Sequence, residues 1–337
     1  MSTMETKNTT YEAPPWYSKE YTGPIRRNSK IKDYLTLSPQ DIKRELEQHV
    51  VGQEEACKQV AIIMYQHLHG HRSVNLLAGP TGSGKSFLAE TLQKIFPDVV
   101  YLRDISNVTN DGWSGGKKVA SLFHGVHNPF SYNGRIYPLL VLDECDKLFT
   151  PKISSGGENV SASVQAEFLS VIHGGEVQFK EEKDKIFTIN TRPMSFLFAG
   201  AFEKQAKSIA EKESGSSMGF GASFEKIQSY NWAITIEDVQ EAGCIAELCG
   251  RMQKVISLNK LDEAQFLSML GNKGAGPVFE LEQEFNIRMY LSEAKKREMA
   301  HNACQSGLGV RGIKNQLRCY IDEAIWEDCN THYVEVV

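Results

Sequence analysis

The feature that most restricts how this chain can fold is a complete phosphate loop, G-x-x-x-x-G-K-[ST], at residues 79–86. The apolar segment 74–78 before it predicts a strand, and the pattern of residues 85–95 after it predicts a helix. A chance match in a Gly-rich turn is the alternative; it is expected on the order of once in a hundred such chains, and the flanking strand and helix make it rarer. The strand–loop–helix order therefore predicts an α/β fold that binds a phosphorylated ligand.

The loop also indicates which residues bind that ligand, which we expect to be ATP with Mg²⁺. Glycines let the backbone wrap closely around phosphates, with N–H groups facing the negative charge. Lys85 is expected to reach the β and γ phosphates, and the Ser86 hydroxyl to ligate Mg²⁺. The residues expected to surround the nucleotide here are Gly79, Pro80, Thr81, Gly82, Ser83, Gly84, Lys85, Ser86 and Phe87.

A second acidic element lies further along the chain, where the apolar run 139–142 ends in Asp143 and Glu144. Acids at the end of a buried strand are costly unless they have a function. Asp143 can hold the Mg²⁺ shell, and Glu144 can polarise the attacking water. An ordinary charged rim of the sheet is the alternative for this segment taken alone. Together with the phosphate loop, it predicts that Lys85 and Glu144 are catalytic and that Ser86 and Asp143 bind the metal.

Apolar strands alternate with helical stretches through most of the chain, as in βαβ units around a parallel sheet. Further strands are predicted at 99–102, 139–143 and 196–199, helices at 39–49, 53–69, 117–123 and 164–173, and a polar hairpin at 176–190. After residues 255–259 the pattern changes to helices at 262–270, 291–303 and 310–328, with strands at 285–290 and 333–336. We predict a flexible tail at 1–36, a large α/β nucleotide-binding domain at 37–255, and a small, mainly helical α+β lid domain at 256–337.

Composition argues against several other classes of protein. The net charge of −5 and the lack of a basic, aromatic-interleaved stretch argue against nucleic-acid binding. No apolar run approaches the roughly 20 residues that span a bilayer, so we expect no membrane association and a cytoplasmic location. The seven cysteines include no C-x-x-C pair, so no zinc is expected. His67, His69 and His71 have a spacing that suits a metal, but a solvated helix end is the commoner reason for such a cluster.

From about residue 37 to the C-terminus the chain resembles one family, the AAA+ ATPases, and within it the Clp unfoldases of the ClpX type. Residues 49–54 (HVVGQE) are similar to the segment that lines the adenine pocket of that family, which implies that Val51 and Gln53 contact the base. Residues 143–148 (DECDKL) are similar to the family's DEIDKI.

Two arginines stand at family positions. Residues 243–251 (GCIAELCGR) resemble GLIPEFIGR, which implies that Arg251 is the arginine finger, and residues 309–312 (GVRG) resemble GARG, which implies that Arg311 is the nucleotide sensor. A guanidinium fork stabilises charge that builds on the γ-phosphate, so both roles suit arginine. The alternatives are a surface salt bridge for Arg251 and a helix-start charge for Arg311, although a cation there opposes the helix dipole.

Two further segments resemble loops with which the family contacts other proteins. Gly112-Trp113-Ser114-Gly115 stands where the family has GYVG, which implies that Trp113 grips polypeptide substrates in the ring pore; a buried Trp is the alternative. Met218, Gly219 and Phe220 are similar to the IGF tripeptide that docks on a ClpP-type peptidase; folding back onto the core is the alternative.

Three features depart from the family. No cysteine precedes Cys57, so its N-terminal zinc-binding domain is not expected. The segment 176–193 lacks the basic loop of the pore entrance, and 196–200 contains no polar sensor-1 residue.

The resemblance implies a homohexameric ring that unfolds proteins with ATP and feeds a ClpP-like peptidase. A remodelling chaperone without a peptidase, a nucleic-acid motor, and a nucleotide-gated scaffold that hydrolyses slowly are the alternatives.

Overall fold

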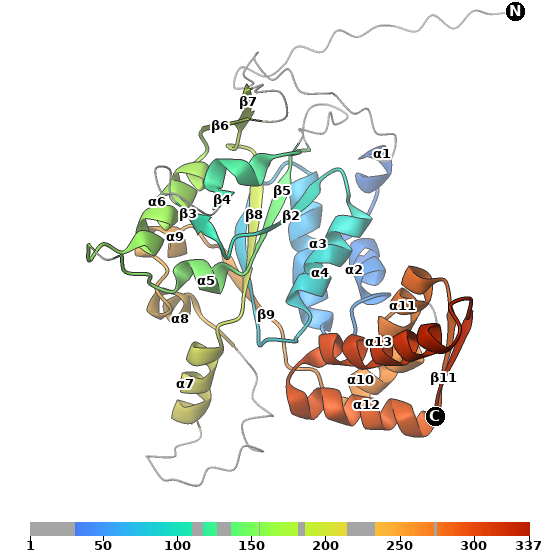
Figure 1. The fold of residues 1–337 in the computed structure, drawn as a ribbon. Helices are drawn as coiled ribbons and strands as arrows, with labels where there is room; N and C mark the ends of the chain where they lie inside the picture. Colours follow the sequence, from blue (N-terminus) through green and yellow to red (C-terminus); the bar gives the residue numbers. More distant parts are fainter. Residues whose placement is uncertain are drawn as a thin grey trace, which may run out of the picture.

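Five short strands rich in apolar residues form one parallel sheet in the computed structural model (Figure 1). The structure describes residues 31–109, 117–126, 136–154, 156–180, 186–213, 233–272 and 275–337. The sheet order is β2-β5-β8-β1-β9, with β1 (Val74–Ala78), β2 (Val100–Asp104), β5 (Leu139–Asp143), β8 (Ser195–Gly200) and β9 (Lys254–Ser257). Because all five strands run in one direction, their carboxyl ends meet at a single edge, where ligands bind in open α/β sheets.

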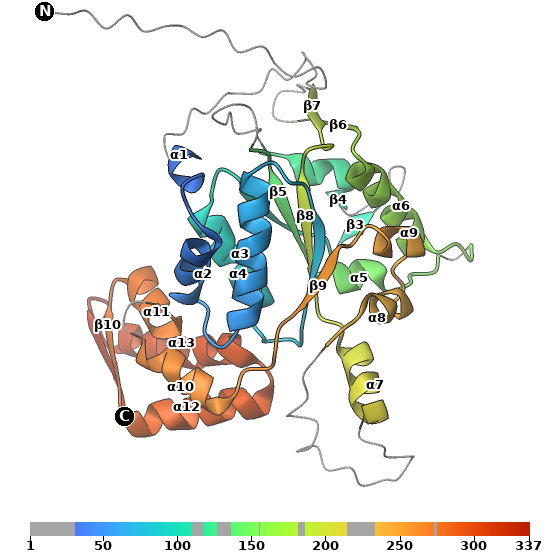
Figure 2. The same ribbon diagram turned by 180° about the vertical axis from the view of Figure 1, so that it is seen from behind.

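Side chains of the central strands alternate between two hydrophobic cores, one on each face of the sheet. In β8, Phe196 and Phe198 pack in the first core, and Leu197 and Ala199 in the second. The first core contains residues of η1 (Val119–Phe123), α5 (Cys145–Phe149), α6 (Val160–His173), α8 (Ile236–Glu241) and α9 (Ala246–Cys249). The second contains residues of α1 (Ile31–Tyr34), α2 (Pro39–Glu47), α3 (Glu54–Leu68) and α4 (Lys85–Ile95). Figure 2 shows these two groups of helices on opposite sides of the sheet, which confirms the predicted α/β class.

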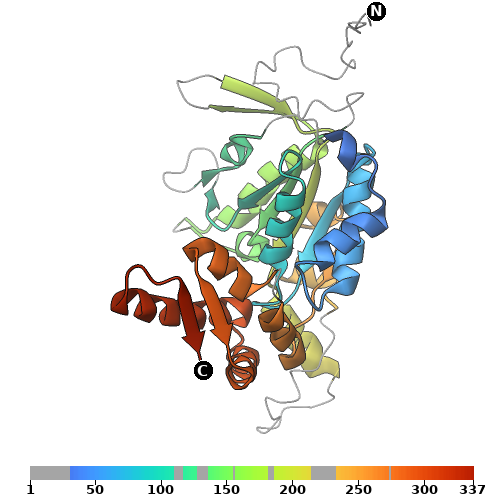
Figure 3. The ribbon, with the colours of Figure 1, turned by 90° about the vertical axis from the view of Figure 1, so that its right-hand side faces the viewer.

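A third core forms in the C-terminal part of the chain, between residues 261 and 336. Its elements are α10 (Glu263–Gly271), α11 (Pro277–Phe285), β10 (Arg288–Leu291), α12 (Glu293–Ser306), α13 (Gly309–Glu327) and β11 (Tyr333–Val336), and the two strands pair in parallel. Figure 3 shows this part, in orange and red, at the lower end of the sheet. A small helical unit with a two-stranded sheet is what the α+β pattern predicts.

The remaining elements are β3 (Val108–Thr109), β4 (Lys117–Lys118), β6 (Glu176–Lys180), β7 (Ile186–Asn190) and α7 (Glu203–Glu213). The antiparallel pair β6–β7 confirms the predicted hairpin, which stands at the opposite end of the sheet from the C-terminal helices (Figure 1). None of the helices in the described part of the chain has the length and apolar content that crossing a bilayer requires.

Two expected elements differ from the structure, and one strand that was not predicted joins the sheet. Residues 117–123 are not an α-helix, because Lys117–Lys118 pair with β3 and only the five residues that remain form a helix, of the 3₁₀ type. The strand predicted at 285–290 begins only at Arg288, because Pro277 starts helix α11 and Asn286, in the left-handed conformation, ends it. The sheet also gains β9, which spans residues 255 and 256, where the sequence pattern divides the two domains.

Candidate active site

A cavity of about 290 Å³ lies where the carboxyl ends of the strands face the start of α13. The phosphate loop, the end of β5 and the exit of β8 line one side of it, and helices of the C-terminal part line the other. Residues from both sides of the expected domain division therefore enclose the same space. The expected site residues that line it are Val51, Thr81, Gly82, Ser83, Gly84, Lys85, Ser86, Phe87, Asp143, Glu144 and Arg311.

The phosphate loop turns into α4 without a capping side chain. Gly84, the N-cap residue, has φ 95°, a left-handed conformation that favours glycine. Because no side chain caps this helix, the N–H groups of its first turn are available to phosphate oxygens. The loop therefore has the backbone that the sequence pattern predicts.

Lys85 is 8% exposed, and its Nζ donates to the carbonyl oxygens of Gly79 and Pro80 at 2.8 and 2.9 Å. Burial lowers the pKa of Lys85, and the nearby Asp143 carboxylate opposes that shift. No carboxylate of the described residues forms an ion pair with this ammonium group. A buried cation held only by carbonyl groups suits a site that binds a triphosphate.

The proposed metal ligands meet directly. The Ser86 hydroxyl donates to Asp143 Oδ2 at 2.6 Å, which joins the start of α4 to the end of β5. Asp143 Oδ1 accepts the backbone N–H of Glu144 at 2.9 Å. A hydroxyl and a carboxylate beside the phosphate loop are the oxygen ligands that Mg²⁺ prefers. These residues therefore fit Mg²⁺ bound to a nucleotide.

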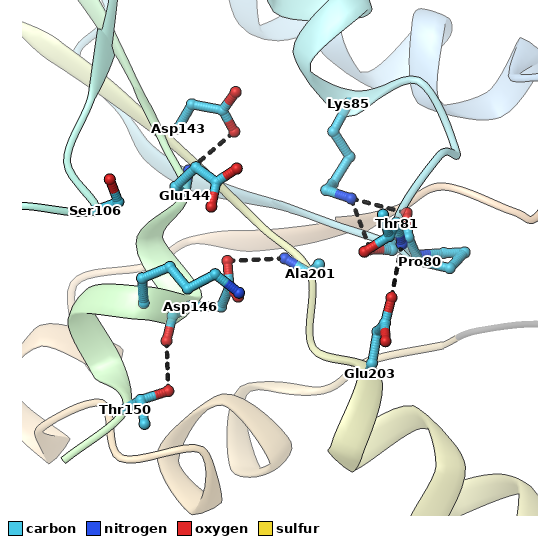
Figure 4. A network of polar contacts seen from close by, with 12 residues as sticks. Pro80, Thr81, Lys85, Ser106, Asp143, Glu144, Asp146, Thr150, Ala201 and Glu203 are labelled. Atoms are coloured by element: carbon cyan, nitrogen blue, oxygen red, sulfur yellow. Dashed lines mark hydrogen bonds and ion pairs between the residues drawn. The ribbon is translucent and has the colours of Figure 1, made fainter. Parts of the chain in front are cut away.

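Glu144 is one of two described non-glycine residues with a positive φ, at 63°. Such a conformation costs about 1–2 kcal/mol, and strain of this kind clusters at functional sites. The turn places Glu144 on the cavity wall beside Asp143 (Figure 4). This position is compatible with the expected action on water.

A third and a fourth carboxylate join the site, and the sequence pattern did not indicate either. Glu203, the first residue of α7, accepts the backbone N–H of Thr81 at 3.2 Å, and Asp146 accepts that of Ala201 at 3.1 Å (Figure 4). Hydrogen bonding from Thr81 lowers the pKa of Glu203. Residues 196–200 of β8 contain no polar side chain, and Glu203 lies three residues beyond Gly200. Its position just beyond the strand is the only feature of the sequence that could have indicated that Glu203 contacts the phosphate loop.

Val51 lines the cavity, but Gln53 does not. Gln53 is 4% exposed; its Nε2 donates to the carbonyls of Ser83 and Asn259 at 3.0 and 2.8 Å, and its Oε1 accepts the N–H of Asn259 at 3.1 Å. The structure therefore places Gln53 outside the lining of the cavity, and its contact with the base stays a prediction. Its side chain instead holds the phosphate loop against the segment that follows β9.

Arg311 is exposed and lines the cavity from the first turn of α13. This helix begins so close to the loop that a Cβ on Gly309 would lie 2.6 Å from the Gly82 carbonyl oxygen. Lys314, one turn further along, also lines the cavity and forms an ion pair with Glu280 of α11. The sequence pattern had indicated only Arg311 of these groups.

Arg251 lies away from the cavity, just before β9. It is therefore at the end of the sheet where the parallel strands begin, whereas the phosphate loop is at the end where they finish. It is exposed, and its guanidinium contacts Nε2 of His173 at the end of α6. The structure therefore does not bring Arg251 together with the other site residues of the same chain. Trp113 and the tripeptide Met218, Gly219 and Phe220 lie outside the described residues.

The histidine cluster is partly different from expectation, because His67 is buried rather than solvated. Its ring nitrogens contact Ser195 Oγ at 2.8 Å and the Tyr137 carbonyl oxygen at 2.6 Å. Burial lowers its pKa to about 4. Among the described residues, no three His, Cys, Asp or Glu side chains converge to hold a metal ion.

A family model described as "AAA domain (Cdc48 subfamily)" matches residues 71–255, more than half of the 337 residues. The chain belongs to this AAA domain family. The match contains the phosphate loop, the acidic end of β5 and Arg251. The protein is an ATPase, and membership in the AAA family implies that it uses a nucleotide and Mg²⁺.

Curated relatives extend the similarity beyond the AAA domain. An ATP-dependent Clp protease ATP-binding subunit ClpX from Treponema denticola is 26% identical, over 89% of this chain and 81% of its own length. A ClpX subunit from Borrelia duttonii is 25% identical over 86% of this chain and 74% of its own length. A ClpX 3 subunit from Methylococcus capsulatus is 25% identical over 86% and 76%. The AAA protein is thus similar to Clp-type ATPases over both its α/β and its helical part.

Proposed function

We propose that this AAA protein is an ATP-dependent protein unfoldase and translocase of the Clp type, acting as a homohexameric ring. The observation that carries the proposal is the shared cavity. Lys85, Asp143 and Glu144 line one side of it, and Arg311 lines the other. Hydrolysis at such a site changes contacts with both parts of the chain at once, which is how chemistry can drive motion.

In this proposal each group has one task. Lys85 and the N–H groups at the start of α4 bind the phosphates, while Ser86 and Asp143 hold Mg²⁺, which offsets charge on the phosphate oxygens. Glu144 orients the attacking water and accepts its proton. Arg311 reports the state of the phosphates to α13, and residues 37–255 and 256–337 move as two domains.

The proposal also assigns roles to residues that do not line the cavity. Arg251 acts on the nucleotide of the neighbouring subunit, which is supported by its position at the edge of the sheet far from its own phosphate loop. Trp113 grips the polypeptide substrate. We further propose that Met218–Phe220 dock on a ClpP-type peptidase in the cytoplasm; an unfoldase that acts without a peptidase is the outcome if they do not.

The deciding experiment measures ATP hydrolysis and substrate unfolding on the same protein preparation. The ATPase rate and the loss of fluorescence from a folded reporter with an unstructured tail are followed for wild type, Trp113→Ala and the matched control Trp113→Tyr. We expect Trp113→Ala to keep basal ATPase activity and to lose unfolding, because alanine between glycines offers too little surface to hold a substrate. Tyrosine keeps a rigid aromatic ring and should retain unfolding.

Two results would contradict the proposal. A wild-type protein that hydrolyses ATP but never unfolds the tagged reporter is not an unfoldase of this kind. A Trp113→Ala variant that unfolds at the wild-type rate removes Trp113 from the substrate path. Binding of the ring to a ClpP-type peptidase, with and without Phe220→Ala, separates a protease component from an independent remodelling chaperone.

A further inference from the structure

A carboxylate outside the cavity holds one of the N–H groups of the phosphate loop. Thr81 lines the cavity, and its backbone N–H donates to Glu203 Oε1 at 3.2 Å, whereas Glu203 is not among the lining residues. Figure 4 shows Glu203 pointing at the loop from the start of α7, while Lys85 approaches the same turn from α4. The N–H groups of such a loop normally face the phosphates. One donor of the loop is therefore bonded to an acid of the protein itself.

Packing fixes Glu203 in this position. The residue before it, Phe202, is 2% exposed and packs in the first core. The Ala201 N–H donates to Asp146 Oδ1 at 3.1 Å, and Ala206, further along α7, is also buried in the first core. Glu203 thus lies between two anchored residues, and its backbone cannot leave the loop without disturbing that core.

The charge of Glu203 is not neutralised by a direct contact. Among the described residues, no Lys, Arg or His comes within ion-pair distance of its carboxylate. Hydrogen bonding from Thr81 lowers the pKa of Glu203, and the charges of Lys207 and Lys85 lower it further, so the group is ionised at neutral pH. A full negative charge therefore lies directly behind one N–H group of the loop.

The contact lies in the part of the loop that serves the terminal phosphates. Lys85 Nζ donates to the carbonyl oxygens of Gly79 and Pro80, and the next residue along the chain is Thr81. In loops with this sequence pattern the lysine reaches the β and γ phosphates. The segment bonded to Glu203 is therefore the one in which ATP and ADP differ.

We propose that Glu203 is a specificity-determining residue of the ATP site, which lowers the affinity for a terminal phosphate and so sets the ratio of ATP binding to ADP binding. It acts in two ways: it withholds the Thr81 N–H from phosphate oxygens, and its charge repels theirs. Both effects are larger for a triphosphate than for a diphosphate, because repulsion between charges weakens with distance. A group that repels one ligand more than another is a common source of specificity. The proposal concerns the site within one chain and is independent of the ring and of unfolding.

The test compares nucleotides that differ only in their phosphates. AMP, ADP and a non-hydrolysable imido analogue of ATP displace a fluorescent nucleotide, in the presence of Mg²⁺, from wild type, Glu203→Gln, Glu203→Ala and Glu241→Gln. Glutamine keeps an oxygen for the Thr81 N–H and removes the charge, whereas alanine removes both. Glu241 is an exposed acid of α8 and serves as the control for loss of one negative charge.

We expect the affinity for the triphosphate relative to ADP to rise about three- to tenfold in Glu203→Gln and at least as much in Glu203→Ala, as for a partly exposed charge-assisted contact. Affinity for AMP should stay within about twofold of wild type. Because each ratio is taken within one protein, a change in its folded or assembled fraction cancels. The gain in Glu203→Gln should also shrink between about 0.1 M and about 1 M salt, as the screening length falls from about 10 Å to about 3 Å.

Each other result would overturn the proposal. An unchanged or lower ratio in both variants would mean that Glu203 does not oppose a terminal phosphate. Equal weakening of all three nucleotides would mean that its carboxylate only supports the shape of the loop. A gain that persists at high salt, or the same gain in Glu241→Gln, would exclude the charge of Glu203 as the cause.

Discussion

Glu144 and Lys85 line the same cavity but should fail in different ways when they are replaced. Glu144→Gln keeps Asp143, Ser86 and the loop, so ATP should bind normally while hydrolysis falls about 10²- to 10⁴-fold, the usual contribution of a general base. Lys85→Ala removes the buried ammonium group and should weaken ATP binding about ten- to a hundredfold. Equilibrium binding and steady-state hydrolysis, with the exposed Glu45→Gln as control, distinguish the two. Near-normal turnover by Glu144→Gln would assign the catalytic carboxylate elsewhere.

His67 should make stability depend on pH. Its pKa is about 4 in the folded chain, against 6.5 when unfolded, because burial disfavours the charged ring. Above pH 6.5 both states are neutral and the contribution is complete; as pH falls from 6.5 toward 4 the unfolded chain alone takes up the proton. The free energy of unfolding should then fall by about 1.4 kcal/mol per pH unit from this group.

The measurement is chemical denaturation of wild type and His67→Gln across that range. Glutamine does not titrate, so the stability advantage of wild type should shrink as pH falls. An advantage that is constant from pH 7 to pH 5 would show that His67 does not titrate as proposed.

Helix α13 meets the phosphate loop through glycine rather than through a side chain. Gly309 and Gly307 have φ of 59° and 67°, so alanine at either position is strained, at a cost of about 1 kcal/mol. Only at Gly309 would the new Cβ approach the Gly82 backbone, at 2.6 Å from its oxygen, while at Gly307 it would meet nothing within 4 Å. The two substitutions therefore share the strain and differ in the collision.

We expect Gly309→Ala to move α13 off the loop and to raise KM for ATP more than tenfold, because Arg311 moves with the helix. Gly307→Ala should lose a similar amount of stability and keep KM within about threefold. Steady-state kinetics combined with thermal unfolding of both variants make the comparison. Equal KM values in the two would mean that the contact between α13 and the loop has no part in ATP binding.

The two ends of the parallel sheet, where its strands begin and where they finish, are chemically different. One edge contains the phosphate loop and the carboxylates, and the opposite edge contains Arg72 and Arg251. Edges that complement each other in this way suit head-to-tail contacts, which close into a ring when the rotation between copies allows it.

Arg251→Ala tests this arrangement as a property of the assembly. It should bind nucleotide normally and hydrolyse it about 10³-fold or more slowly, as when an arginine finger is removed. Addition of Glu144→Gln protein should restore part of the rate, since that partner still supplies Arg251. Wild-type activity of Arg251→Ala in the assembled state would exclude the finger role.

Local patterns were sufficient for the elements that depend only on neighbouring residues. The phosphate loop, the apolar strand before it and the two acids at the end of β5 each lie within a short segment, where glycine conformation and continuous apolar runs decide the structure. The strand Tyr333–Val336 was predicted to the residue for the same reason. Lys85, Asp143 and Glu144 were assigned to one site because an acidic strand end and a phosphate loop occur in the same chain, and the parallel sheet brings the ends of both strands to one side.

Contacts between distant residues were decided by the tertiary structure alone. Gln53 bonds to Asn259, 206 positions away, and Glu203 to Thr81, 122 positions away. No periodicity in the sequence encodes such pairs, because they form only when strands from distant parts of the chain have paired in the sheet. The pairing of β9 with β1 is one example, and it places Arg251 near Arg72. Residue type and spacing thus determined what chemistry the chain can perform, while strand pairing determined which side chains meet to perform it.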